Sequence, residues 1–193
     1  INKYQNIKEY YYSVYCGIWI PLSNAKILGN HPLYGFNIGI KYKKFLSAIS
    51  IYNQFLKSPN YYYTKKEDST IKTNTFNNIC IELEIGKELF NTNKTIIDIL
   101  TGIGFNSLKI LEDNTNKYSS KYLYTYNLNI GLEYVFNLTN FYSLILQAKY
   151  NLLNFRNTGG TDISGNAINI NIILRILSDD NKIRGLKSLQ YRR

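Results

Sequence analysis

The residues best suited to chemistry in this chain are charged side chains that interrupt apolar, alternating segments. They share the face opposite the apolar one and comprise Lys41, Glu82, Glu84, Asp98, Glu133, Lys149 and Arg175. Carboxylates and cations in such a set can pair with one another or line a narrow path for ions. Which of these they do depends on the elements that position them.

Those elements are predicted by a strict alternation of residue types. From residue 122 to residue 136, every even position is a large apolar or aromatic residue, and the odd positions are mostly Thr, Asn, Gly and Glu. This is a strand with one apolar face, and the pattern recurs about eight times. The other face carries carboxylates and amides, which a water-soluble sandwich would not point at its core. We therefore predict an all-β fold, an eight-stranded antiparallel up-and-down transmembrane β-barrel.

The predicted strands are separated by links that alternate between short and long. The strands are expected at residues 10–22, 33–42, 46–56, 76–87, 95–106, 122–136, 141–153 and 166–177. Short turns are expected at 43–45, 88–94 and 137–140, and long loops at 23–32, 57–75, 107–121 and 154–165. Outer-membrane barrels place short turns and both termini in the periplasm and long loops outside. We accordingly predict an N-terminal periplasmic segment (1–9), the barrel (10–177) and a basic periplasmic tail (178–193).

Composition agrees with this architecture. The 193 residues include 19 Tyr, 9 Phe and one Trp, and Tyr favours the boundary between lipid and water. The net charge of +10 raises the alternative of nucleic-acid binding. The basic residues are scattered over turns and tails, so we expect them to meet outer-membrane lipid and lipopolysaccharide, and we expect no nucleic-acid partner.

A resemblance to a known family rests on the Asn-, Lys- and Ile-rich composition and on two stretches of the chain. These are His31-Pro32-Leu33-Tyr34-Gly35-Phe36 and Gly159-Gly160-Thr161-Asp162-Ile163-Ser164-Gly165-Asn166. The chain resembles the small eight-stranded outer-membrane barrels typified by the transmembrane domain of outer-membrane protein A and by outer-membrane protein X. In its composition and in these two stretches, the chain is similar to the version of this family that is common in Bacteroidota. The resemblance covers roughly residues 10–177 and implies a fold more strongly than a function.

An eight-stranded barrel has an interior that side chains fill. We therefore expect the inward charges to form an ion-pair and hydrogen-bond network without an open pore, and a narrow gated path for ions is the alternative. Gly102 and Gly104 lie on the same face as Asp98 and would make room for longer opposing side chains.

Catalytic, metal and cofactor sites are not predicted. The single histidine, His31, precedes Pro32 in a predicted loop without a placed acid, so a packing or turn role is expected. Cys16 and Cys80 fall on opposite faces and should stay unpaired. Oxygen ligands for calcium could come from two loops, Glu112 and Asp113 with Asn114 in one and Asp162 with Ser164 in the other. Their spacing does not match a calcium-binding loop closely, so we expect these residues to lie in solvated turns.

The function predicted from these features is that of a non-enzymatic integral outer-membrane protein, acting as a recognition or accessory subunit of an outer-membrane complex. The candidate contact surface lies in the 57–75 loop and comprises Tyr61, Tyr62, Tyr63, Lys65 and Lys66. The competing interpretation is that these tyrosines extend a strand pair as part of the interfacial girdle. A small channel for ions or solutes is the alternative function. A soluble ligand-binding barrel of the lipocalin type would require an apolar lumen and a polar exterior, the reverse of the faces assigned here.

Polar residues that break the apolar face, Asn53 and Ser47, suggest contact with another outer-membrane protein or an error of one residue in the register.

Overall fold

The computed structural model describes residues 8–66, 69–92, 94–111 and 120–178. Most of the predicted N-terminal segment and tail, and the loop residues Glu112, Asp113 and Asn114, lie outside the described residues.

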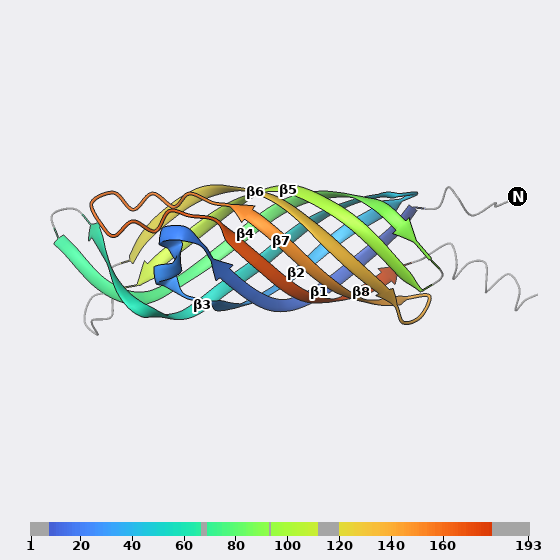
Figure 1. Ribbon diagram of the computed structural model, residues 1–193, viewed down its shortest axis with the longest axis horizontal. Coiled ribbons are helices and arrows are strands. Elements are labelled where there is room, and N and C mark those ends of the chain that lie inside the picture. The colour runs from blue at the N-terminus through green and yellow to red at the C-terminus, as the bar shows by residue number, and fades with distance from the viewer. Residues whose placement is uncertain (1–7, 67–68, 93, 112–119, 179–193) are drawn as a thin grey trace, which may run out of the picture.

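The described residues form eight antiparallel strands and one short 3-10 helix (Figure 1). The strands are β1 (Lys8–Pro21), β2 (His31–Tyr42), β3 (Phe45–Lys66), β4 (Ser69–Asn91), β5 (Thr95–Leu111), β6 (Ser120–Asn137), β7 (Tyr142–Leu152) and β8 (Ala167–Ser178), with the helix η1 (Ser23–Leu28) between β1 and β2. Each strand pairs with the next, and β8 pairs with β1, so the sheet closes. The predicted eight-stranded up-and-down barrel is confirmed.

The outer surface of the barrel is apolar and bounded by tyrosines. On β2, Tyr34 and Tyr42 bracket Phe36, Ile38 and Ile40, and all five side chains are exposed. Tyr142 and Tyr150 bracket a similar run on β7. Eight residues of a strand tilted by about 40° rise about 20 Å, close to the roughly 25 Å apolar band of outer-membrane barrels. An apolar exterior around a polar interior is the arrangement of a barrel that spans a membrane.

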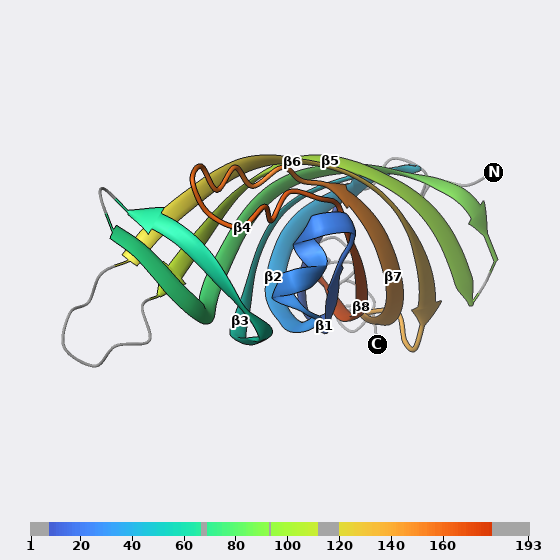
Figure 2. The same ribbon diagram turned by 60° about the vertical axis from the view of Figure 1, so that its left-hand side comes forward.

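The two ends of the barrel differ. One end, called here the turn end, holds the short β2–β3, β4–β5 and β6–β7 connections together with the start of β1 and the end of β8. The other end, called the loop end, holds η1, the β3–β4 tip and the long β7–β8 link at 153–166. Figure 1 shows the loop end on the left, and Figure 2 shows η1 lying across the opening of the barrel there.

The predicted long loop at 57–75 is wrong. β3 continues to Lys66 and β4 begins at Ser69, so this segment is a strand hairpin that rises beyond its neighbours. The pairing register shifts between Lys57 and Tyr62, and Leu56 adopts a positive φ of 124°. On β3 the even residues face inward on both sides of this bulge, whereas on β4 the inward parity changes from odd at Ile71 and Thr73 to even at Phe76 and Asn78. The change on β4 hides the alternation in the sequence.

Other boundaries differ at strand ends. β4 extends to Asn91 with a second register shift between Glu88 and Phe90, and β5 extends to Leu111 where the prediction ended at 106. His31 is the first residue of β2 and not a loop residue. The described residues include no helix with the length and hydropathy of a membrane span.

Placing a charge on the middle of the outer face tests this assignment of faces. Ile38 lies midway between Tyr34 and Tyr42, and Ile38→Arg is expected to lower the free energy of unfolding by about 2–4 kcal/mol because the guanidinium meets hydrocarbon. Ser47→Arg, which lies close to the turn-end edge, should cost about 0–1 kcal/mol. Urea unfolding of the barrel in lipid vesicles measures both. Equal effects at the two positions would contradict the assignment.

Candidate functional site

The centre of the barrel interior holds a buried ion triad. The Lys149 ammonium on β7 lies 2.6 Å from Glu82 Oε2 and 2.9 Å from Glu84 Oε1, both on β4, and all three side chains are almost inaccessible to solvent. Because residues two apart on a strand share a face, β4 presents both carboxylates to the same ammonium. The triad joins strands on opposite sides of the barrel.

Neutral groups complete the triad. Tyr52 donates its hydroxyl to Glu82 Oε1 at 2.7 Å, and Asn127 donates to the same oxygen. Ser50 donates to Glu84 Oε2 at 2.7 Å. The carboxylates are therefore bound on both oxygens, which is the condition for keeping charges in a low-dielectric interior.

A second charged group lies nearer the turn end. Arg175 Nη2 lies 2.8 Å from Glu133 Oε2, and the guanidinium carbon lies 4.4 Å from the centre of the Tyr11 ring. Gln147 donates to the other oxygen of Glu133 and accepts a hydrogen bond from Asn171. This network links β6, β7, β8 and β1.

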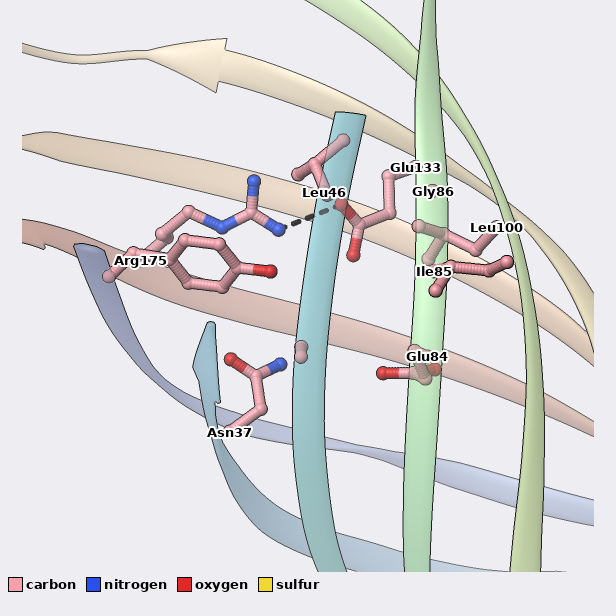
Figure 3. Close-up of a pocket in the computed structure, with 10 residues that line it drawn as sticks. Asn37, Leu46, Glu84, Ile85, Gly86, Leu100, Glu133 and Arg175 are labelled. Carbon is pink, nitrogen blue, oxygen red and sulfur yellow. Dashed lines mark hydrogen bonds and ion pairs between the residues drawn. The ribbon is translucent and has the colours of Figure 1, made fainter. Parts of the chain in front are cut away.

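A small cavity lies beside this pair (Figure 3). Asn37, Leu46, Glu84 and Leu100 contribute to its lining. Its free volume is about 10 Å³, room for about one water molecule. Side chains therefore fill the lumen at this level.

The two remaining predicted site residues lie at the turn end. Lys41 Nζ is 2.8 Å from Glu88 Oε2, and Asn91 donates to the other oxygen of Glu88. Asp98 is fully buried between Glu88 and Glu133 in the strand register, and neither of its oxygens has a hydrogen-bond partner in the described part of the chain. The structure thus brings six of the seven predicted charges into ion pairs and leaves Asp98 outside them.

Apolar and aromatic side chains close the interior at the loop end. His31 packs between Trp19 and Phe76, with ring centres 6.1 and 4.6 Å away, and Leu28 of η1 is fully buried beside them. The Nε2 atom of His31 lies 2.6 Å from the Leu28 carbonyl oxygen. This set, with Phe155 and Ile163 of the β7–β8 link, is called here the apolar plug.

The β7–β8 link is tied to the β3–β4 hairpin. Thr161 N–H donates to the Tyr63 carbonyl at 2.8 Å, and Tyr63 N–H donates to Thr161 Oγ1 at 2.9 Å. Asn157 accepts from Thr64 and Lys121 and donates to the Tyr63 carbonyl. The β7–β8 link and the described part of the β3–β4 hairpin thus form one hydrogen-bonded unit, called here the loop-end platform.

The far side of this link contacts η1. Asn24 donates to Asp162 Oδ2 at 2.6 Å, and Ser164 N–H donates to Asp162 Oδ1. Hydrogen bonds from Ser164 hold the pKa of Asp162 below its usual value, so the carboxylate stays charged near neutral pH. Asp162 is exposed, as expected for a solvated turn, and each of its carboxylate oxygens also accepts a hydrogen bond from another residue of the protein.

The described residues of the predicted contact surface do not share one face of the hairpin. Tyr61, Tyr63 and Lys65 are exposed on the hairpin, whereas Tyr62 is fully buried and donates to the Thr75 carbonyl. The prediction that all three tyrosines are presented on a loop is wrong, because successive side chains of a strand point to opposite faces. The backbone of Lys66 ends β3.

Sequence reasoning missed Glu88 and the inward tyrosines. Glu88 follows Glu82 and Glu84 on the same parity, so their inward alternation extends to it, although the sequence predicts a turn there. Tyr15 and Tyr11 lie against Gly35 and Gly39, where an added Cβ would fall within about 2.5 Å of the ring. Inward glycines at matching register are the signal for such rings.

The predicted spacer glycines and the cysteines occupy the expected faces. An added Cβ at Gly104 would meet the Glu82 side chain at 2.6 Å, and one at Gly102 would meet Asn129 at 3.0 Å. Cys16 is exposed, Cys80 is buried, and neither is in a disulfide. Among the described residues, no cluster of three His, Cys, Asp or Glu side chains is placed to hold a metal ion.

Comparison with known proteins shows likeness in structure alone. No protein-family model matches the chain, and no curated protein matches it in sequence. Neisserial surface protein A is similar with a TM-score of 0.65 and 12% identity, covering 86% of this chain and 96% of that one. The N-terminal β-barrel domain of Pseudomonas aeruginosa OprF has a TM-score of 0.51 and 11% identity, with 87% and 97% covered.

The attachment invasion locus protein Ail of Yersinia pestis, solved with the heparin analogue sucrose octasulfate, has a TM-score of 0.52 and 11% identity, with 88% of this chain and 98% of that one covered. The chain therefore has the fold of the small eight-stranded outer-membrane barrels.

Removing the central cation tests the triad. Lys149→Met leaves two carboxylates buried without a counter-charge and is expected to lower the free energy of unfolding by about 3–5 kcal/mol. Urea unfolding in vesicles, followed by the fluorescence of Trp19, measures this. The matched control Glu82→Gln/Glu84→Gln/Lys149→Met should recover most of the loss, because it removes all three charges together. A Lys149→Met barrel within about 1 kcal/mol of the native one would contradict the account.

Proposed function

We propose that this protein is an integral protein of the bacterial outer membrane whose filled barrel anchors a recognition surface, and that it serves as an accessory subunit of an outer-membrane protein complex. Its apolar outer band, its polar interior and its likeness in fold to small outer-membrane barrels support the location. In this proposal the turn end and both termini face the periplasm, and the loop end faces outward.

The observation that carries the proposal is the filled interior. The Lys149 triad occupies the centre, and the apolar plug closes the loop end. Because side chains fill the interior of such a barrel, its outer surface and its loop end are the surfaces that can contact another molecule. The loop-end platform, with Tyr61, Tyr63 and Lys65 exposed on its hairpin, is the surface that we assign to contact with another outer-membrane protein.

A non-enzymatic role is part of the proposal. His31 is the residue best suited to acid-base catalysis, and it is buried in the apolar plug with Nε2 at the Leu28 carbonyl oxygen. This environment supports a packing role.

A narrow path for ions or small solutes is the second candidate. The side-chain amides of Asn129 and Asn169 are buried in the lumen, and none of their polar atoms has a hydrogen-bond partner in the residues that the structure describes. Water or an ion passing through the lumen would satisfy these groups.

The accessory role predicts a companion protein. Extraction from outer membranes in mild detergent, followed by a native gel and mass spectrometry, should give a species well above one 22.5 kDa chain and its micelle, with a stoichiometric partner. Tyr61→Ala/Tyr63→Ala should release the partner, because it removes two half-exposed rings from the platform.

The matched control is Tyr10→Ala/Tyr12→Ala, which removes two equally exposed rings at the turn end and should retain the partner. A lone monomer from native membranes would argue against the accessory role.

A further inference from the structure

Buried carboxylates outnumber buried cations inside the barrel. Five carboxylates and two cations are buried among the described residues, and a third cation, Lys41, is partly buried. The carboxylates are Glu82, Glu84, Glu88, Asp98 and Glu133, and the buried cations are Lys149 and Arg175. An uncompensated charge is costly in a low-dielectric interior, so a proton on one of the carboxylates would reduce the excess of negative charge.

One of the five carboxylates differs from the others. The four glutamates all accept hydrogen bonds from lysine, arginine, hydroxyl or amide groups. Asp98 is 0% exposed, and neither of its carboxylate oxygens has a hydrogen-bond partner in the described part of the chain. Burial without donors disfavours an ionised carboxylate much more than a neutral carboxylic acid. Asp98 is therefore the carboxylate best placed to hold the proton.

The immediate neighbours of Asp98 are apolar along its own strand and acidic across it. Ile96 and Leu100 lie two residues before and after it on β5 and share its inward face. In the strand register Asp98 lies opposite Glu88 of β4 and Glu133 of β6. The apolar neighbours offer no donor, and like charges on both adjacent strands oppose ionisation of Asp98.

The cations near Asp98 are already paired. The titratable groups that interact electrostatically with it are Lys41 of β2, Glu88 of β4, Glu133 of β6, Arg175 of β8 and Tyr11 of β1. Lys41 Nζ lies 2.8 Å from Glu88 Oε2, and Arg175 Nη2 lies 2.8 Å from Glu133 Oε2. Because each pair is neutral overall, an ionised Asp98 would add one uncompensated charge to this group. A protonated Asp98 removes that charge and supplies an O–H donor beside carboxylate acceptors.

We propose that Asp98 is a proton-binding site of the folded barrel, which takes up one proton from solution on folding and is held as the neutral carboxylic acid between the Lys41–Glu88 and Arg175–Glu133 ion pairs. The site makes the closed barrel sensitive to the acidity of its surroundings. It concerns the interior alone and does not depend on the partner assigned to the loop end.

The direction of this pH dependence follows from proton linkage. In the unfolded chain an aspartate releases its proton near pH 4, whereas the folded barrel keeps the proton of Asp98 to higher pH. Over that interval the folded state binds one proton more than the unfolded state, so the unfolding equilibrium constant rises with pH, by at most about tenfold per pH unit. Mild acid therefore stabilises the folded barrel at this site.

Urea unfolding in lipid vesicles, followed by Trp19 fluorescence, tests this in the native chain and in Asp98→Asn, which keeps the shape of the side chain and removes its titration. The ratio of the native unfolding constant to that of Asp98→Asn should rise by about tenfold or more between pH 4 and pH 6. The matched control is Asp162→Asn, because Asp162 is an exposed carboxylate with a hydrogen-bond donor on each oxygen. Its ratio should stay constant or fall over the same range.

Infrared spectra of the folded barrel provide a second measurement. At pH 5 the native protein should show the carbonyl stretch of a buried protonated carboxyl, and Asp98→Asn should lack it. A native spectrum without that band at pH 5 would overturn the proposal, whether or not the variant folds. A ratio for Asp98→Asn that does not change with pH would overturn it as well.

Discussion

Closing eight strands into a barrel leaves an interior that side chains fill, and a charge that points inward is stabilised when it finds an opposite charge there. The Lys149 ammonium does so between Glu82 and Glu84, and Arg175 does so with Glu133 and the Tyr11 ring. Glycines on the facing strands make the space, because the rings of Tyr11 and Tyr15 occupy the positions that side chains at Gly39 and Gly35 would take. The charge placement, the glycine pattern and the absence of a wide lumen among the described residues all follow from this constraint.

A filled barrel also supports its loop end. The apolar plug packs η1 and the β7–β8 link onto Trp19 and Phe76, and hydrogen bonds from Asn157 and Thr161 fasten that link to the β3–β4 hairpin. The exposed tyrosines and lysines of the hairpin are therefore held on a fixed scaffold. Binding to a fixed surface costs less ordering entropy than binding to mobile loops. This is the physical basis for assigning function to the loop end and not to the lumen.

The fold could be predicted because strict alternation of residue types specifies strands and their faces, and Lys41, Glu82, Glu84, Glu133, Lys149 and Arg175 all lie in interior ion pairs as their parity indicated. Prediction failed where a bulge interrupts the alternation. The register shift between Lys57 and Tyr62 made a strand hairpin look like a loop, whereas Tyr62 is buried because it keeps the inward parity of Tyr52 and Gln54. Glu88 keeps the inward parity of Glu82 and Glu84, but the second register shift ends the alternation directly after it, so the sequence there resembles a turn. Which charges meet across the barrel depends on closure and stagger, and a single sequence does not specify either.

The central claim is that the interior is closed and that interaction takes place outside it. The most direct measurement is the conductance of the purified barrel in a planar lipid bilayer under symmetric salt. The account predicts no current steps above the bilayer background while the barrel is shown to be inserted. Steady conductance that rises in proportion to salt concentration would contradict it, because ions would then be crossing the region occupied by the Lys149 triad and the apolar plug.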